Sequence, residues 1–295
     1  MKLHRGLVTT CTTALVVFAM TPTAWAECFK PLPLEDLASR NVDYFRDLGD
    51  WRSPIKKARQ VKRFLPPDSG VGDVVNVDFY YVVFKKPLNK SLVETFKNIR
   101  LHFDEFARGS TGDYDFKPYG TLIDVSKYGE ENRKQWQSDN PIGALMTFKL
   151  DTHYPNPVNN LQKAVKRIEI VNPWGSVQVT CATKTDFIFS TVEIATGWKH
   201  SVAGSRGFGI RDAENGNWMF YSKAFDRESD AWQNRIAGKG VFCYGHLFWL
   251  NFYSNMKDFL NKNGMPVQRV ASTNHGTAWW PLRPNDPPPA QPPCK

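Results

Sequence analysis

The chain has no hydrophobic run long enough to cross a membrane as a helix, and it lacks the residue patterns of metal and redox centres. A spanning helix needs roughly 18 or more consecutive apolar residues, and no stretch of the sequence reaches that length. There are 5 cysteines and 6 histidines in 295 residues, with no C-x-x-C or H-E-x-x-H spacing. These absences argue against thiol redox catalysis, zinc ribbons and zinc proteases. The sequence predicts neither a metal site nor a cofactor.

The first 26 residues have the three-part pattern of a secretory signal peptide. Lys2 and Arg5 precede the apolar stretch GLVTTCTTALVVFAM, and the segment TPTAWA then ends with small residues at Ala24 and Ala26. We therefore expect cleavage after Ala26. The remaining chain is predicted to be periplasmic or secreted and to have no transmembrane segment.

Basic residues outnumber acidic ones. Lys and Arg total 38 and Asp and Glu total 29, which gives a formal net charge of +9. This excess favours anionic partners such as phospholipid headgroups, anionic polysaccharide or acidic protein; the alternative is that it serves solubility alone. No nucleic-acid-binding motif is recognised, so nucleic acid is not a predicted partner. A hydrophobic or anionic small molecule and a protein partner remain as candidates.

Four cysteines follow the predicted cleavage site, namely Cys28, Cys181, Cys243 and Cys294. An even number in an oxidising compartment predicts disulfide bonds, and four cysteines allow three pairings, which the sequence leaves open. Cys181 and Cys243 both lie in apolar segments, which favours a bond between them. Cys28 and Cys294 would then join the two ends of the chain.

Hydrophobic patterning predicts a mixture of strands and helices. Apolar residues spaced by three and four predict amphipathic helices within 34–48, over 88–107, where Asn89 or Ser91 could be the N-cap, and over 242–264. Runs rich in β-branched and aromatic residues predict strands over 74–84, 140–150, 164–171 and 177–194, followed by a hairpin that turns at Asn215-Gly216.

This order of elements predicts an α+β protein with a curved antiparallel sheet packed on a long C-terminal helix. We expect four segments: a signal peptide (1–26), an N-terminal helical and loop segment (27–73), a single α+β domain (74–264) and a proline-rich C-terminal tail (265–295).

The stretch GWKHSVAGSRGFGIRD (197–212) raises the question of a catalytic site. AGSRG (203–207) is close to the G-x-S-x-G nucleophile elbow, and a triad of Ser205, Asp226 and a histidine, His246 or His275, would have the matching chain order. An elbow needs a strand–turn–helix context, whereas a hairpin is predicted after Arg206. A phosphate-binding loop would also need a helix at this point.

The alternative is a strand in which glycines mark a bulge or a close approach of other backbone or ligand. Arg206 would then either pair with a carboxylate such as Asp226 or bind an anionic ligand. His200, Ser205, Arg206 and Asp226 converge around one hairpin in the sequence, so they are the residues that we would place near a site, with His200, Ser205 and Asp226 as candidate catalytic groups.

The order of strands followed by an aromatic-rich helix resembles the helix-grip superfamily of START-like lipid-binding and polyketide-cyclase-like proteins. The segments that carry this resemblance are FIFSTVEI, FGIRD, WMFYSKAF and GHLFWLNFYSNMKDFL, within 140–264. The resemblance implies a bent sheet around the last helix and an apolar cavity. The resemblance assigns no functional residues; the ligand-binding residues that we expect from the sequence are Arg206, Trp218, Phe220 and Trp249.

Three functions follow as hypotheses. The first is an exported soluble protein that binds a hydrophobic or amphipathic small molecule, a lipid-binding candidate. The second is a secreted effector or interaction protein that uses a basic surface and the proline-rich tail on a partner. The third is a serine-type hydrolase that uses Ser205, and the balance of the sequence favours a protein that is not an enzyme.

Overall fold

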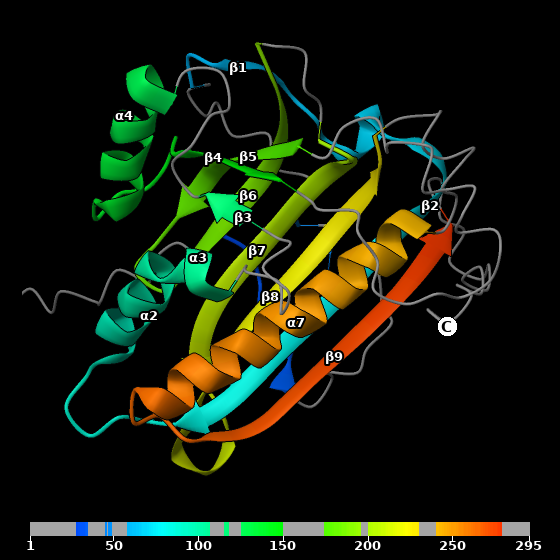
Figure 1. Ribbon diagram of the computed structural model, residues 1–295. Coiled ribbons are helices and arrows are strands. Elements are labelled where there is room, and N and C mark those ends of the chain that lie inside the picture. The colour runs from blue at the N-terminus through cyan, green and yellow to red at the C-terminus, as the bar shows by residue number, and fades with distance from the viewer. Residues whose placement is uncertain are drawn as a thin grey trace, which may run out of the picture.

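The computed structural model describes residues 28–34, 45, 47–48, 58–106, 115–117, 125–149, 174–195, 200–229 and 240–278. These residues form a nine-stranded sheet in which every pair of neighbours is antiparallel, with helices packed on it (Figure 1). The α+β class is therefore confirmed. The predicted signal peptide, the predicted strand 164–171 and the part of the predicted tail beyond 278 lie outside the described residues.

The sheet has the strand order β3-β4-β5-β6-β7-β8-β2-β9, and β1 pairs with the end of β6. Its strands are β1 (Val61–Phe64), β2 (Val71–Lys85), β3 (Asp115–Lys117), β4 (Leu145–Lys149), β5 (Trp174–Ala182), β6 (Asp186–Ile194), β7 (Val202–Asp212), β8 (Asn217–Glu228) and β9 (Val267–Ala278). The helices are α2 (Leu92–Leu101), α3 (Phe103–Phe106), α4 (Val125–Gln137) and α7 (Gly240–Lys262), with short 3-10 turns η2 (Pro67–Ser69) and η3 (Glu214–Gly216).

The hairpin of β7 and β8 confirms the prediction for this segment. Asn215 and Gly216, at the turn, have φ values of 56° and 70°. Asparagine tolerates this left-handed conformation better than most residues, and glycine adopts it freely. The predicted strands within 177–194 are β5 and β6, and Ser91 caps α2, where its side chain accepts a hydrogen bond from the backbone of Glu94.

The two faces of the sheet carry separate hydrophobic cores. On β2, Tyr80, Val82 and Phe84 point to the face that α2, α3 and α7 cover, whereas Phe79 and Tyr81 point to the other face. This alternation follows from the two-residue period of a strand. Figure 1 shows α2, α3 and α7 together on the first face, which we call the helix face. The second face is covered by side chains of the N-terminal segment, Phe29, Leu32, Phe45 and Leu48.

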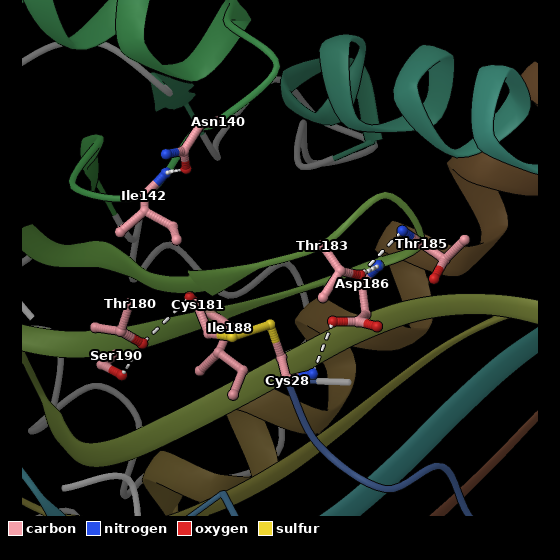
Figure 2. The surroundings of a disulfide bond; sticks show 10 residues. All are labelled: Cys28, Asn140, Ile142, Thr180, Cys181, Thr183, Thr185, Asp186, Ile188 and Ser190. Carbon is pink, nitrogen blue, oxygen red and sulfur yellow. Dashed lines mark hydrogen bonds between the residues drawn. A yellow bond between two sulfur atoms is a disulfide. The ribbon is translucent and has the colours of Figure 1, made fainter. Parts of the chain in front are cut away.

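A disulfide bond holds this N-terminal segment on the sheet. Cys28 is bonded to Cys181 of β5, and the backbone N–H of Cys28 donates to Asp186 Oδ1 at 3.1 Å (Figure 2). The favoured pairing of Cys181 with Cys243, and of Cys28 with Cys294, was therefore wrong. The apolar surroundings of Cys181 were a misleading guide, because its segment packs against the N-terminal segment instead of α7.

The end of the predicted α+β domain also differs. Helix α7 spans most of the range for which the sequence predicted a long helix, but β9 follows it, so the helix is not the last element. Residues 265–295 were predicted as a tail, whereas β9 pairs with β2 along its whole length, from Val74 opposite Ala278 to Phe84 opposite Val267. No helix in the described part of the chain is long and apolar enough to span a membrane.

Candidate functional site

Arg206 lies near the middle of β7 and points to the helix face, where it meets polar side chains of β2 and β8. We call these residues the Arg206 cluster: Asn76, Asp78, Arg206, Ser222 and Asp226. All five are buried. Their strands are neighbours in the order β7-β8-β2, and the register places Asn76 opposite Asp226 and Asp226 opposite Gly204.

The cluster is built on a two-point ion pair. Arg206 Nη1 lies 2.7 Å from Asp78 Oδ1, and Nη2 donates to Oδ2 at 2.7 Å. Nη1 also donates to the Ser222 hydroxyl at 3.3 Å. Burial alone would lower the pKa of Arg206, but the charge of Asp78 outweighs it, so the pKa is raised and the guanidinium stays charged. The sequence analysis expected an acidic partner such as Asp226; the direct partner is Asp78.

The carboxyl group of Asp226 has a raised pKa, which favours its neutral form. Burial, and then the negative charge of Asp78, raise its pKa to about 8, against the attraction of Arg206. Asn76 Nδ2 donates to Asp78 Oδ2 at 3.1 Å and lies 3.5 Å from Asp226 Oδ1, the outer limit of a hydrogen bond. Asn76 Oδ1 is buried and has no hydrogen-bond partner among the described residues. The cluster thus holds balanced charges, one acidic proton and one open acceptor.

Aromatic side chains cover the charged group from the helix side. The guanidinium carbon of Arg206 lies 3.9 Å from the ring centre of Trp249 on α7 and 5.7 Å from that of Tyr80 on β2. The Tyr80 hydroxyl lies 2.7 Å from His246 Nδ1, and its ring stacks on that of Tyr253. A cation over an aromatic face gains roughly 0.5–2 kcal/mol, more when water is excluded. Arg206 and Trp249, two of the predicted ligand-binding residues, are therefore in direct contact.

Helix α7 is buried unevenly along its length. In its C-terminal half, Tyr253, Met256 and Leu260 are at most 1% exposed. In its N-terminal half, Phe242 is buried, whereas His246, Phe248 and Trp249 are half-buried. Trp249, whose ring lies over Arg206, is thus partly open to solvent, whereas Tyr253, Met256 and Leu260 are closed into the core.

The residues of the predicted serine triad do not come together. Because Ser205 and Arg206 are neighbours in a strand, their side chains point to opposite faces. The Ser205 hydroxyl lies 3.0 Å from that of Ser190, which in turn lies 2.8 Å from that of Thr180. Asp226 shares the helix face with Arg206.

His200 is buried just before β7. Its Nδ1 accepts from the Val202 backbone N–H at 3.1 Å, and its backbone oxygen accepts from the Ser229 hydroxyl. Burial lowers the pKa of its imidazole to about 4, so the ring is neutral. These contacts tie the ends of β7 and β8 together. His275 is on β9, and its side chain lies outside the described part of the structure.

Two other predicted ligand-binding residues belong to the hydrophobic core of the helix face. Phe220 packs between Phe208 and Tyr253. Trp218 lies six residues along β8 from Ala224, the residue opposite Arg206, which places it about 20 Å from the cluster at roughly 3.3 Å per residue. Trp218 thus lies far from the Arg206 cluster. Phe220 lies between them along β8 and belongs to the hydrophobic core.

The glycines of β7 are explained by close packing, as the strand interpretation predicted. A Cβ at Gly204 would lie 2.3 Å from the backbone oxygen of Phe225 and 2.6 Å from Asp226 Cα. A Cβ at Gly207 would lie 2.5 Å from the ring of Phe29. Gly204 lets β8 approach beside the cluster, and Gly207 makes room for the N-terminal segment on the opposite face.

The sequence analysis missed Asn76 and Asp78. Both sit inside the apolar run VVNVDFYYVVF, four and two positions before Tyr80. A strand places residues with this spacing on one face. Two polar residues on the same face of an otherwise apolar strand need buried partners, and this was the signal in the sequence that could have located the site.

The Arg206 cluster brings hydrogen-bonding groups together beside aromatic rings. In the described part of the chain no group of three or more His, Cys, Asp or Glu side chains is placed to hold a metal ion. Arg206 and Asp226 carry N–H and O–H donors, and Asn76 Oδ1 is an open acceptor. The ring of Trp249 adds a flat aromatic surface beside them. Such convergence of a few polar groups in an apolar setting is typical of small-molecule sites.

No protein-family model matches this chain, and no curated protein matches it.

Proposed function

We propose that the protein is an exported binding protein for a hydrophobic or amphipathic small molecule, held between the N-terminal half of α7 and the sheet. The observation that carries this proposal is the half-buried ring of Trp249 over Arg206 of the buried cluster, with the half-buried ring of Phe248 packed beside it. A molecule with an apolar body could lie against these rings, and its polar end could reach the hydrogen-bonding groups beneath. The long helix along a bent sheet also supports a helix-grip-like arrangement, in which the ligand lies between these elements (Figure 1).

Export is part of the proposal. The bond between Cys28 and Cys181 is compatible with a periplasmic or secreted protein, since disulfides persist in oxidising compartments. The signal-peptide pattern in 1–26 supports the same location.

The direct test is a titration of the purified full chain with N-phenyl-1-naphthylamine, an uncharged probe whose fluorescence rises in apolar sites. We expect saturable binding by the wild type. Trp249→Ala removes the ring that covers Arg206 and should weaken binding about tenfold, because burial of an aromatic side chain contributes roughly 1.5–3 kcal/mol.

Leu250→Ala is the matched control. Leu250 is the next residue on the same helix, is apolar and is 40% exposed, so it points away from the sheet. This variant should bind the probe like the wild type. If the wild type does not bind the probe, or if the two variants lose affinity equally, the proposed function is wrong.

A further inference from the structure

We infer that this site selects an uncharged head group that both donates and accepts a hydrogen bond, a hydroxyl or a primary carboxamide, through Asn76 Oδ1 and the carboxyl group of Asp226. The inference rests on the proposed function, because it names the class of ligand for the same site. It follows from the hydrogen-bonding capacity that the cluster leaves unused and from its charge balance.

The first argument is the open acceptor. Asn76 is 3% exposed, and its Oδ1 has no hydrogen-bond partner among the described residues, although its Nδ2 is committed to Asp78. A buried polar atom that lacks a partner costs roughly 1–3 kcal/mol. A ligand group with an O–H or N–H donor would remove that cost, whereas a group that only accepts hydrogen bonds would not.

The second argument is the acidic proton of Asp226. Asp226 is 8% exposed, and the long 3.5 Å approach of Asn76 Nδ2 leaves room for a stronger interaction. Burial beside Asp78 keeps its carboxyl protonated at neutral pH. Its O–H is then a donor, and the complementary ligand atom is an acceptor. A hydroxyl or a primary carboxamide supplies both the donor and the acceptor in one small group.

The third argument is the balance of charge. Asn76, Asp78 and Arg206 act on Asp226 directly. Around this group lie Tyr80 and Ser222, which contact Arg206, His246 and Tyr253 on α7, which sense the charge of Asp78, and Glu228, two residues further along β8. Arg206 and Asp78 neutralise one another. Burial lowers the pKa of His246 and raises that of Tyr253, so both stay neutral. An ionic head group would enter this neutral cluster without a counter-charge, and burial of an unpaired charge is unfavourable.

The test is a competition series in which ligands of equal chain length displace N-phenyl-1-naphthylamine from the full-length protein at pH 6.5. The competitors are 1-decanol, decanamide, 1-methoxydecane, decanoate and decylammonium. We expect the alcohol and the amide to bind about tenfold more tightly than the ether, which cannot donate, and than the two ions. This series uses the wild type alone, so it does not depend on the folding of a variant.

The second arm varies pH. Affinity of the wild type for 1-decanol should fall about tenfold between pH 6.5 and 9.5, because ionised Asp226 no longer donates and adds a buried charge. Asp226→Asn keeps an N–H donor in the same place and cannot ionise, so its affinity should not change over this range. Glu228, whose pKa is raised to about 7 by burial, is unchanged in the variant and provides an internal control.

A third variant, Ser205→Ala, controls for substitution of a buried polar residue in the same sheet, since Ser205 lies on the opposite face. It should keep the pH dependence of the wild type. Equal affinity for all five competitors would overturn the inference, and so would an Asp226→Asn variant with the pH dependence of the wild type. In either case, binding of the probe by the wild type would still uphold the proposed function. Absence of probe binding overturns both.

Discussion

The bond between Cys28 and Cys181 should account for a large part of the stability of the protein. The two cysteines are 153 residues apart in sequence. Closing a loop of that length reduces the entropy of the unfolded chain by an amount worth about 5 kcal/mol at 25 °C, and removal of natural disulfides costs roughly 2–5 kcal/mol. A folded domain typically has a free energy of unfolding of about 5–15 kcal/mol. Loss of this bond should therefore remove a substantial fraction of it.

The measurement is urea unfolding of the double variant Cys28→Ala/Cys181→Ala, followed by fluorescence and circular dichroism. We expect the free energy of unfolding to fall by about 2–5 kcal/mol. Both cysteines are replaced, because a single replacement would leave a thiol free to pair with another cysteine. The control is Cys243→Ala, which leaves the bond between Cys28 and Cys181 intact.

Peptide mapping without reduction checks the pairing itself. A peptide pair that joins Cys28 to Cys181 is expected from the wild type. A pair that joins Cys181 to Cys243, or a loss of stability below about 1 kcal/mol in the double variant, would refute the reasoning. In either case the N-terminal segment would have to be held on the sheet by its side-chain contacts alone.

Three further changes test other parts of the structure by urea unfolding. Gly207→Ala should lower the free energy of unfolding by about 1–3 kcal/mol, because its Cβ would lie 2.5 Å from the ring of Phe29; unchanged stability would mean that the ring is not packed there. Asp226 has its pKa raised from 3.8 to about 8, so between these values the folded state holds a proton that the unfolded state has released, and stability falls as pH rises. Asp226→Asn should therefore lose less stability than the wild type between pH 5 and 8, and equal losses would contradict the burial of this carboxyl. Asp47→Ala should lower the free energy of unfolding by up to about 3 kcal/mol, because it removes the carboxylate that lies 2.7 Å from the buried ammonium of Lys223. Lys223→Met removes the buried charge itself, so its stability should be unchanged or higher. Equal destabilisation by both variants would show that packing, and not charge, is what they disturb.

Local patterns predicted those elements in which sequence and tertiary environment agree. The hairpin turns at Asn215-Gly216 because these two residues tolerate positive φ, and β5 and β6 are rich in residues that suit a buried strand. β9 was missed because VQRVASTNHGTA is mostly polar and does not alternate. It is an edge strand that pairs with β2, and an edge strand does not need two apolar faces.

The candidate site was predicted in part: the sequence marked Arg206 and Trp249 but not the partners of Arg206 on β2. The contact between Arg206 and Trp249 joins a strand and a helix that the sequence marked separately as carrying ligand-binding residues. The ion pair joins Arg206 to Asp78, which is 128 positions earlier, and a single sequence does not state such long-range pairings. Ser205 was a plausible nucleophile by local motif, but strand alternation sends it to the opposite face from Asp226.

The place of β2 between β8 and β9 has a consequence for synthesis of the chain. β2 is among the first strands to be made, yet it pairs on its two sides with β8 and β9. Val82 lies opposite Val270, about 190 residues later in the chain. At roughly 5–20 residues per second, β2 waits roughly 10–40 seconds for this second partner. During that interval both of its edges are open to pairing with other chains, so association of unfinished chains through β2 competes with folding until β9 arrives.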